Sequence, residues 1–292
     1  MFDLLNIILP TFFVIIIGYL LGKFTKLDMS PVVDVLFYIG LPAIAFVSML
    51  TKDIVLIEAT KVWASAILVM FGSGVLAFIA FKIVKQKHSG LYLPIIIMNT
   101  VNIPFPIIYL AYGSEGLFAA TLYYIPNVLF LYSIGIMILA RKHWKEGIKE
   151  MAKVPTIYAA LVGLILNLLD VQIPTLIFNP LEFLSTMVIP LVLLVLGSKL
   201  SSVKITALPT TLMASAIRLG GGFLLGLAAA NLFGLTGVLR SVVILDSAMP
   251  AAVNSSLLAM KYENEADLIA SMVFVTTVVS ILTIPLLLYT LG

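Results

Sequence analysis

The sequence predicts an all-α polytopic membrane protein. We expect ten transmembrane helices in two inverted five-helix repeats, with helices 4 and 9 broken and crossing at the midplane. Three observations predict this fold: the composition, a series of long apolar runs, and two polar, proline-containing stretches inside such runs. Apolar residues make up 62% of the 292 residues and charged residues only 11%, which excludes an ordinary soluble domain.

Apolar runs of roughly 20 residues, the length that crosses a bilayer, give the candidate spans. The first run has no basic flank and no cleavage-site pattern, so we interpret it as a retained helix rather than a signal peptide. The sixth is the weakest, because its largely apolar part covers only residues 157–169. The ten runs lie near 4–22, 31–50, 55–82, 91–111, 116–140, 153–172, 179–199, 206–233, 237–260 and 265–290.

Basic residues gather in alternate loops and predict the orientation in the cell membrane. By the positive-inside rule the lysine-rich loops are cytoplasmic, and both termini are extracytoplasmic. The longest of these loops, 141–153, is a basic linker between the repeats 1–140 and 154–292. The cytoplasmic set is Lys23, Lys26, Lys82, Lys85, Lys87, Arg141, Lys142, Lys145, Lys149, Lys153, Lys199, Lys204 and Lys261, and the opposite loops carry only Lys52 and Lys61.

An internal repeat follows from the spacing of prolines and glycines. Because each half has five spans, the second half enters the membrane from the opposite side, and the repeat is inverted. Glycines also allow close helix packing, which we expect at Gly18 and Gly22 and at the two glycine clusters of the repeat. The matched positions are Pro31 and Pro180, Pro42 and Pro190, residues 72–74 and 220–222, and Pro104 and Pro250, all 146 to 149 residues apart.

The fourth and ninth spans are predicted to be interrupted. Pro104 and Pro106 lack a backbone N–H and their rings clash with the preceding turn, and Pro250 repeats this feature in the ninth span. An open backbone inside a membrane is tolerated where it is buried in protein or lines a polar cavity. Asn99 and Asn102 offer amides to such a cavity.

The crossing of two broken helices predicts a ligand site. Half-helix N-termini after Pro104 and Pro250 would carry partial positive charge and unpaired N–H groups, and Asn102, Asn254 and Ser255 would add neutral donors to a carboxylate. The opposing C-termini could hold a cation, so dipoles alone leave the sign of the ligand open. The asparagines equally well satisfy the freed backbone groups.

Two charged residues lie near mid-depth in apolar spans, Arg218 in the eighth and Asp246 in the ninth. Each costs about 2.5 to 3.5 kcal/mol at the bilayer centre, so each should be paired or face water. Two interpretations remain open. One is a structural ion pair, and the other is a proton-coupling carboxylate with a basic neighbour.

Several function classes lack support. Cysteine is absent, which removes disulfides and thiolate chemistry. His88 and His143 lie in different loops without metal-ligand spacing, and no phosphate loop, nucleophile elbow or dinucleotide fingerprint occurs. We therefore expect no enzyme activity, cofactor, metal or nucleic-acid partner.

Four motifs resemble the auxin efflux carrier family, and the resemblance covers the whole chain. The short linker is similar to the compact prokaryotic members, which are linked to malate and malonate, rather than to the long-looped plant PIN-FORMED auxin exporters. The motifs are Leu41-Pro-Ala-Ile-Ala-Phe46, Asn99-Thr-Val-Asn-Ile-Pro104 with Ala111-Tyr-Gly113, Pro190-Leu-Val-Leu-Leu-Val-Leu-Gly197 and Met249-Pro-Ala-Ala-Val-Asn254.

The resemblance implies a scaffold of helices 1, 2, 6 and 7 and a moving transport domain of helices 3–5 and 8–10. It places Asn102, Pro104, Pro250 and Asn254 at the crossover site. It also implies a homodimer formed through the scaffold, surrounded by membrane lipid.

The sequence thus favours a secondary transporter of organic anions, such as indole acids or malate and malonate, working by elevator-type alternating access. The alternative is a cation/proton antiporter of related fold, which ranks second because the crossing offers only Asp246 instead of paired acids. A channel and a non-transporting receptor are further alternatives. The identity of the anion, the direction of transport and the coupling ion stay open.

Overall fold

The computed structural model describes residues 2–25, 27–51, 55–140 and 144–291, which are helical throughout apart from short connections. Lys26, Lys52, Arg141, Lys142 and His143, used in the sequence argument, lie outside the described residues. The helices are α1 (Phe2–Phe24), α2 (Ser30–Val35), η1 (Leu36–Gly40), α3 (Leu41–Leu50), α4 (Leu56–Ile83), η2 (Ser89–Leu91), α5 (Tyr92–Ile96), α6 (Pro104–Phe130), η3 (Leu131–Gly135), α7 (Ile136–Ala140), α8 (Trp144–Met151), α9 (Pro155–Leu168), α10 (Thr175–Thr186), α11 (Val188–Leu200), α12 (Leu208–Ala216), η4 (Ile217–Gly221), α13 (Gly222–Leu232), α14 (Gly237–Ser247), α15 (Val253–Lys261) and α16 (Ala266–Leu291).

Seven helical segments of the described chain are long and apolar enough to cross a membrane, and α9 is a shorter apolar helix. The protein is therefore a multi-pass membrane protein. The seven are Asn6–Phe24, Ser30–Leu50, Leu56–Ile83, Pro104–Leu139, Thr175–Leu200, Leu208–Leu232 and Ala266–Leu291.

The segment Pro104–Leu139 is not one straight helix. Gly113 has φ 62° and ψ −150°, a backbone conformation that residues with a Cβ rarely adopt. A Cβ at this position would meet nothing within 4 Å, so the backbone angle, not crowding, calls for glycine. The chain turns here between two helical pieces, 104–112 and 114–139.

Glycines set the closest helix contacts. A Cβ on Gly18 would meet the backbone of Leu194, and a Cβ on Gly197 would meet the backbone of Ile15 and Tyr19. Such contacts let α1 and α11 approach backbone to backbone. The predicted close packing at Gly18 is confirmed.

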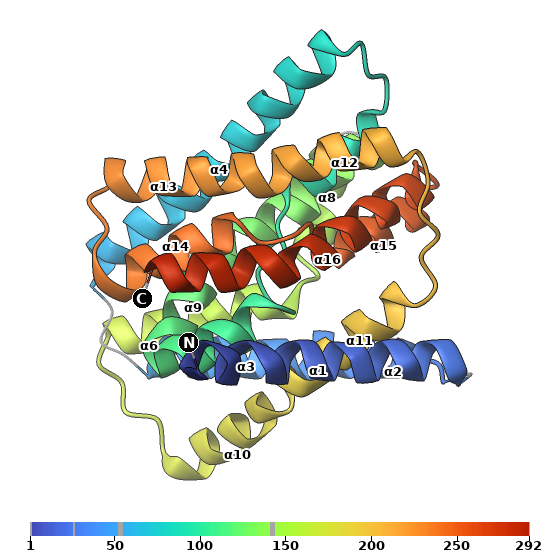
Figure 1. Ribbon diagram of the computed structural model, residues 1–292. Coiled ribbons are helices and arrows are strands. Elements are labelled where there is room, and N and C mark those ends of the chain that lie inside the picture. Colours follow the sequence, from blue (N-terminus) through green and yellow to red (C-terminus); the bar gives the residue numbers. More distant parts are fainter. Residues whose placement is uncertain (1, 26, 52–54, 141–143, 292) are drawn as a thin grey trace.

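Figure 1 shows two groups of helices on either side of α6. One contains α1, α3, α10 and α11, with α1 packed on α11 and α3 packed on α9 and α10. The other contains α4 and α12 to α16, where α14 packs on α6 and α13, and α16 packs on α12 and α15. The view also places the N and C ends of the chain at the same end of the bundle.

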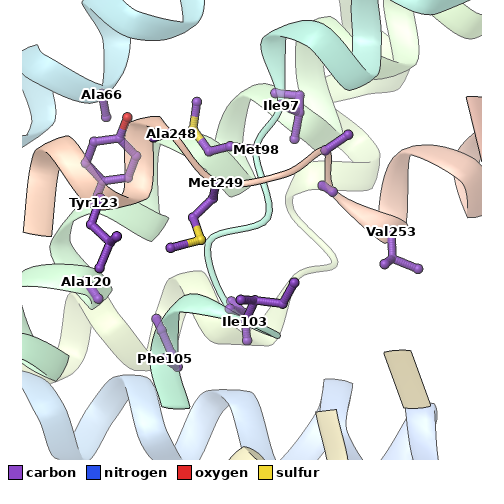
Figure 2. Close-up of a cluster of buried hydrophobic side chains, with 14 of the residues drawn as sticks. Ala66, Ile97, Met98, Ile103, Phe105, Ala120, Tyr123, Ala248, Met249 and Val253 are labelled. Atoms are coloured by element: carbon purple, nitrogen blue, oxygen red, sulfur yellow. The ribbon is translucent and has the colours of Figure 1, made fainter. Parts of the chain in front are cut away.

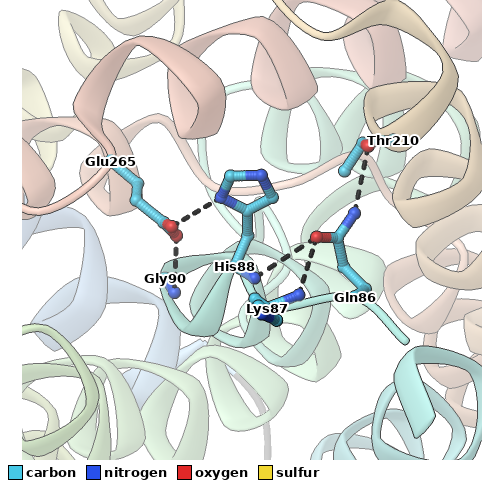
Figure 3. A network of polar contacts seen from close by, with 6 residues as sticks. All are labelled: Gln86, Lys87, His88, Gly90, Thr210 and Glu265. Atoms are coloured by element: carbon cyan, nitrogen blue, oxygen red, sulfur yellow. Dashed lines mark hydrogen bonds and ion pairs between the residues drawn. The ribbon is translucent and has the colours of Figure 1, made fainter. Parts of the chain in front are cut away.

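A polar network ties the segment after α4 to the second half of the chain (Figure 3). Glu265 accepts from the Gly90 N–H at 2.8 Å and lies 2.7 Å from Nδ1 of His88. Gln86 Nε2 donates to Thr210 Oγ1 at 3.0 Å. The connection between α4 and α5 is thereby fixed to the starts of α12 and α16.

The end of α8 is held by charge. Lys153 Nζ lies 2.8 Å and Lys261 Nζ 3.4 Å from the carboxylate of Glu150. The hydrogen bond from Lys153, with a further contribution from Lys261, holds the pKa of the Glu150 carboxyl below its usual range. This contact joins α8 to the C-terminal end of α15.

Candidate functional site

Two helices of the protein stop and restart within the buried interior. The chain leaves helical geometry after Ile96, at the end of α5, and resumes it at Pro104. It does so again between Ser247, at the end of α14, and Val253. Pro104 suits this restart because a proline at the first helical position needs no hydrogen-bond partner for its nitrogen.

The two extended segments run antiparallel and pair with each other. Met98 and Ala251 form an isolated bridge, in which Asn99 N donates to Pro250 O at 2.8 Å and Ala252 N donates to Ile97 O at 3.2 Å. Figure 2 shows the segments passing each other among buried side chains. Backbone groups freed by the two interruptions thus satisfy one another away from water.

Two polar side chains that sequence reasoning missed hold this pair in place. Asn127 Nδ2 donates to Met98 O at 3.0 Å, and Thr276 Oγ1 accepts from Ala251 N at 3.1 Å. The available signal was an asparagine within the apolar run 116–140, where an unpaired amide is costly. Thr276 carried no signal, because a threonine in a membrane helix commonly bonds its own backbone.

Asn99 has a structural use and a free donor. Its Oδ1 accepts from the N–H of Asn102 at 2.9 Å and of Val101 at 3.4 Å, so it shapes the turn that leads into α6. Its Nδ2 is buried without a partner. The amide therefore satisfies freed backbone groups, as one interpretation expected, and still has hydrogens to donate.

Three of the predicted site residues line one small cavity. Asn99, Asn102 and Asn254 meet there with Asn127, in a volume of about 40 Å³. Pro104, Pro250 and Ser255 do not line it. Ser255 is buried nearby with a hydroxyl that has no partner. Because ligand pockets usually span about 300 to 1,000 Å³, the cavity is too small for an organic anion in this conformation.

The N-terminus of α6 offers fewer donors than the sequence argument assumed. Pro104 and Pro106 have no N–H, and the N–H groups of Phe105 and Ile107 already donate to the carbonyls four residues earlier, at 3.2 and 3.4 Å. The expectation of free amides after Pro104 is therefore wrong. The prolines that interrupt the helix also remove its anion-binding donors.

The N-terminus of α15 is different. Its first turn contains no proline, and the amides of Val253 and Asn254 have no backbone acceptor within the described chain. No side chain caps this end. Unpaired N–H groups at a helix start attract anions. The backbone donors for an anion therefore lie at the start of α15 and not at the start of α6.

Arg218 and Asp246 are both fully buried, but they do not pair with each other. Arg218 donates from Nη1 to Ile95 O at 2.7 Å and from Nη2 to Ser247 O. Both carboxylate oxygens of Asp246 have no hydrogen-bond partner. The ion pair that the sequence allowed is absent, because the described hydrogen bonds of the guanidinium go to backbone carbonyls.

A larger cavity of about 490 Å³ lies beside the first half of α6. It is bounded by α1, α3, α6, α10 and α11 and is mostly apolar. Its polar lining includes Thr11, Ser48, Ser114, Glu182 and Ser185. In volume it can hold a small organic molecule.

Comparison with known proteins gives relatives of one kind. Residues 146–288 match the family described as membrane transport protein. The chain is 25% identical to an uncharacterized transporter of Methanocaldococcus jannaschii, covering 97% of both chains. It is 27% identical to an uncharacterized transporter of Methanothermobacter thermautotrophicus, covering 96% of this chain and 95% of the relative. These matches agree with the resemblance seen in the motifs: the second half of the chain matches a family of membrane transport proteins, and nearly the whole chain is similar to two archaeal transporters.

Proposed function

We propose that the protein is a secondary transporter of organic anions that works by alternating access around the paired extended segments. The observation that carries the proposal is the antiparallel pairing of two interrupted helices, with four asparagines beside it. In transporters, such interruptions near the midplane form the substrate site. The family is one of membrane transporters and not an enzyme class.

In this proposal the described helices form ten spans in two inverted repeats. The fourth span combines α5 with residues 104–112, the fifth is 114–139, and α14 with α15 forms the ninth. The repeats are 1–140 and 154–292, joined by the linker 141–153. Two segments related by a two-fold axis in the membrane plane would run antiparallel, as the bridge between Met98 and Ala251 does.

The two groups of helices in Figure 1 suggest how the protein moves. Of the ten proposed spans, counted in chain order, spans 1, 2, 6 and 7 would form a scaffold. Spans 3–5 and 8–10 would form a transport domain that slides against it. The 490 Å³ cavity lies between α1, α3, α10 and α11 on one side and α6 on the other. It would be the route to the crossing. The protein would form a homodimer through the scaffold. Both termini would be extracytoplasmic, in keeping with the two chain ends at one end of the bundle.

The anion would be held at the start of α15. The amides of Val253 and Asn254 and the side chains of Asn102 and Asn254 offer neutral donors, and Ser255 adds a hydroxyl without a partner. Carboxylates such as malate, malonate or an indole acid match such donors. The small volume of the cavity requires that the site opens when the substrate enters.

Asp246 is the candidate for proton coupling, because its carboxylate is buried and unpartnered. The same observation favours a second candidate function, a cation/proton antiporter. The two differ in what a pH gradient drives. An antiporter moves sodium or potassium into proteoliposomes without any carboxylate, whereas an anion carrier requires one.

The test begins with the thermal unfolding midpoint of the purified protein against monocarboxylates, dicarboxylates and indole acids, since a bound ligand raises stability. For the stabilising compound, Asn102→Ala and Asn254→Ala should each weaken binding about 10- to 100-fold, from the loss of about 1.5 to 3 kcal/mol of hydrogen bonding to a charged group. Calorimetry measures both.

Asn231→Ala is the matched control. Its Oδ1 accepts from Arg240 Nη1 at an exposed position outside the site, so binding should be unchanged. Wild-type affinity in both Asn102→Ala and Asn254→Ala would remove these residues from the site. Stabilisation by no carboxylate, together with carboxylate-independent cation uptake, would favour the antiporter.

A further inference from the structure

Arg218 is the buried charge for which the proposed transport cycle gives no role. It lies on the π-helical turn η4, and none of its surface is exposed. Its described acceptors are backbone carbonyls: Ile95 at 2.7 Å, Ile96 at 3.5 Å, and Ser247. A buried guanidinium persists only where acceptors compensate its lost hydration, so the position of these carbonyls explains the residue.

Both principal acceptors are carbonyls that the helix interruptions leave without a donor. In a continuous helix the carbonyl of Ile95 would accept from Asn99 N, and that of Ser247 from Ala251 N. Here Asn99 N donates to Pro250 O, and Ala251 N donates to Thr276 Oγ1. Arg218 replaces both missing donors, one in each half of the chain.

The space between these two helix ends suits a cation. Terminal carbonyls carry partial negative charge, and in carriers with interrupted helices such ends coordinate the coupling ion. In this protein the guanidinium of Arg218, a cation that is part of the chain, fills that space. Gly222 leaves room for it, because a Cβ there would overlap both Arg218 Nη2 and the carbonyl of Ser247.

We propose that Arg218 is the resident cation of this protein: its guanidinium permanently occupies the place between the ends of α5 and α14, so that no metal cation is bound there. The proposal deepens the proposed function, on which its meaning for transport rests, by removing sodium at this point from the coupling cycle. Its test requires no transported substrate.

The experiment measures the thermal unfolding midpoint of the purified full-length protein in choline, sodium, potassium and guanidinium chloride at equal millimolar concentration. Arg218→Ala leaves two carbonyls around a guanidinium-sized space. We expect this variant to unfold at a lower temperature in choline and to regain part of the loss, saturably, with guanidinium. The wild-type midpoint should be the same in sodium and in choline.

Arg240→Ala is the matched control, because it removes an arginine that bonds an exposed side chain. It should show no gain from guanidinium over choline. Arg218→Lys keeps the charge but loses the two-armed geometry, so it should fold, unfold at a lower temperature than the wild type, and gain nothing from sodium. This variant decides the matter if Arg218→Ala cannot be purified folded.

Three results would overturn the proposal: a saturable rise of the wild-type midpoint with sodium, an Arg218→Ala protein that is indifferent to guanidinium, or an Arg218→Lys protein that does not fold. No arm contains an organic anion. A protein that binds no carboxylate can therefore still show a resident cation, and a carboxylate carrier can fail this test, so the two proposals fail separately.

Discussion

Gly222 shows how one missing methyl group permits a buried charge. A Cβ at this position would overlap the guanidinium of Arg218 and the carbonyl of Ser247, whereas a Cβ on Gly220, two residues earlier on the same turn, would meet nothing within 4 Å. Both positions belong to the glycine cluster 220–222. Position 222 therefore requires glycine because a side chain has no space there, whereas position 220 has space for one.

Gly222→Ala should therefore destabilise the protein and Gly220→Ala should not. Overpacking of a buried site costs about 1 to 3 kcal/mol, while alanine in an open helical position is neutral or slightly favourable. The measurement is the thermal unfolding midpoint of the two variants in one detergent. Equal midpoints would show that α13 shifts to accept the methyl group and that the contact at Gly222 is not tight.

At the scale of elements, proline alone does not determine where a helix stops. Pro10, Pro126, Pro180 and Pro285 lie inside helices that continue past them. The sequence placed the interruptions correctly near Pro104 and Pro250 because polar residues accompany those prolines. It could not show that the freed backbone groups would be satisfied by Asn127, Thr276 and Arg218, since these contacts join residues distant in sequence.

The Asp246 and Arg218 pairing illustrates the same limit. Counting along two spans predicted that both residues are in the interior, and both are buried, but the position along a span does not determine which way a side chain points. Neutral carbonyls at helix ends were stronger competitors for the guanidinium than the sequence argument allowed. The cavity between α1, α3, α6, α10 and α11 could likewise not be predicted from the sequence, because it depends on how the two groups of helices fit together.

The connection between α4 and α5 gives a prediction at this scale. Glu265 is its anchor, through the Gly90 N–H and His88. Glu265→Ala should raise hydrogen–deuterium exchange in residues 84–91, because segments with few contacts open at low free energy. Gln86→Ala removes the bond to Thr210 and the local bonds from the N–H groups of Lys87 and His88. It should have a smaller effect, because Glu265 still ties the segment to the start of α16. Unchanged exchange in Glu265→Ala would show that other contacts hold the segment.

At the scale of the whole molecule, the described conformation is one state of the proposed cycle. The large cavity reaches α6 and has a volume of about 490 Å³, whereas the asparagine cavity beside the paired segments has a volume of only about 40 Å³. Alternating access requires a second conformation in which the paired segments become reachable. The two cavities differ in volume and in the exposure of residues that line them, and the rate of opening can be measured with side chains placed in each.

The absence of cysteine in the chain makes this test direct. Ser114 is exposed and lines the large cavity, whereas Thr100 is buried and lines the small one. Ser114→Cys should react at once with a membrane-impermeant thiol reagent applied from one side. Thr100→Cys should react slowly, at a rate set by opening of the crossing, and a stabilising carboxylate should change that rate while leaving the rate at position 114 less affected.

The side of entry decides between mechanisms. Under alternating access, Thr100→Cys and Ser255→Cys in membrane vesicles should each be labelled from both sides, in proportions that substrate alters, because the same site faces either solution in turn. A channel would give simultaneous labelling from both sides at rates that substrate does not redistribute. Labelling from a single side under every condition would contradict alternating access and leave a binding protein without transport as the remaining function for the paired segments.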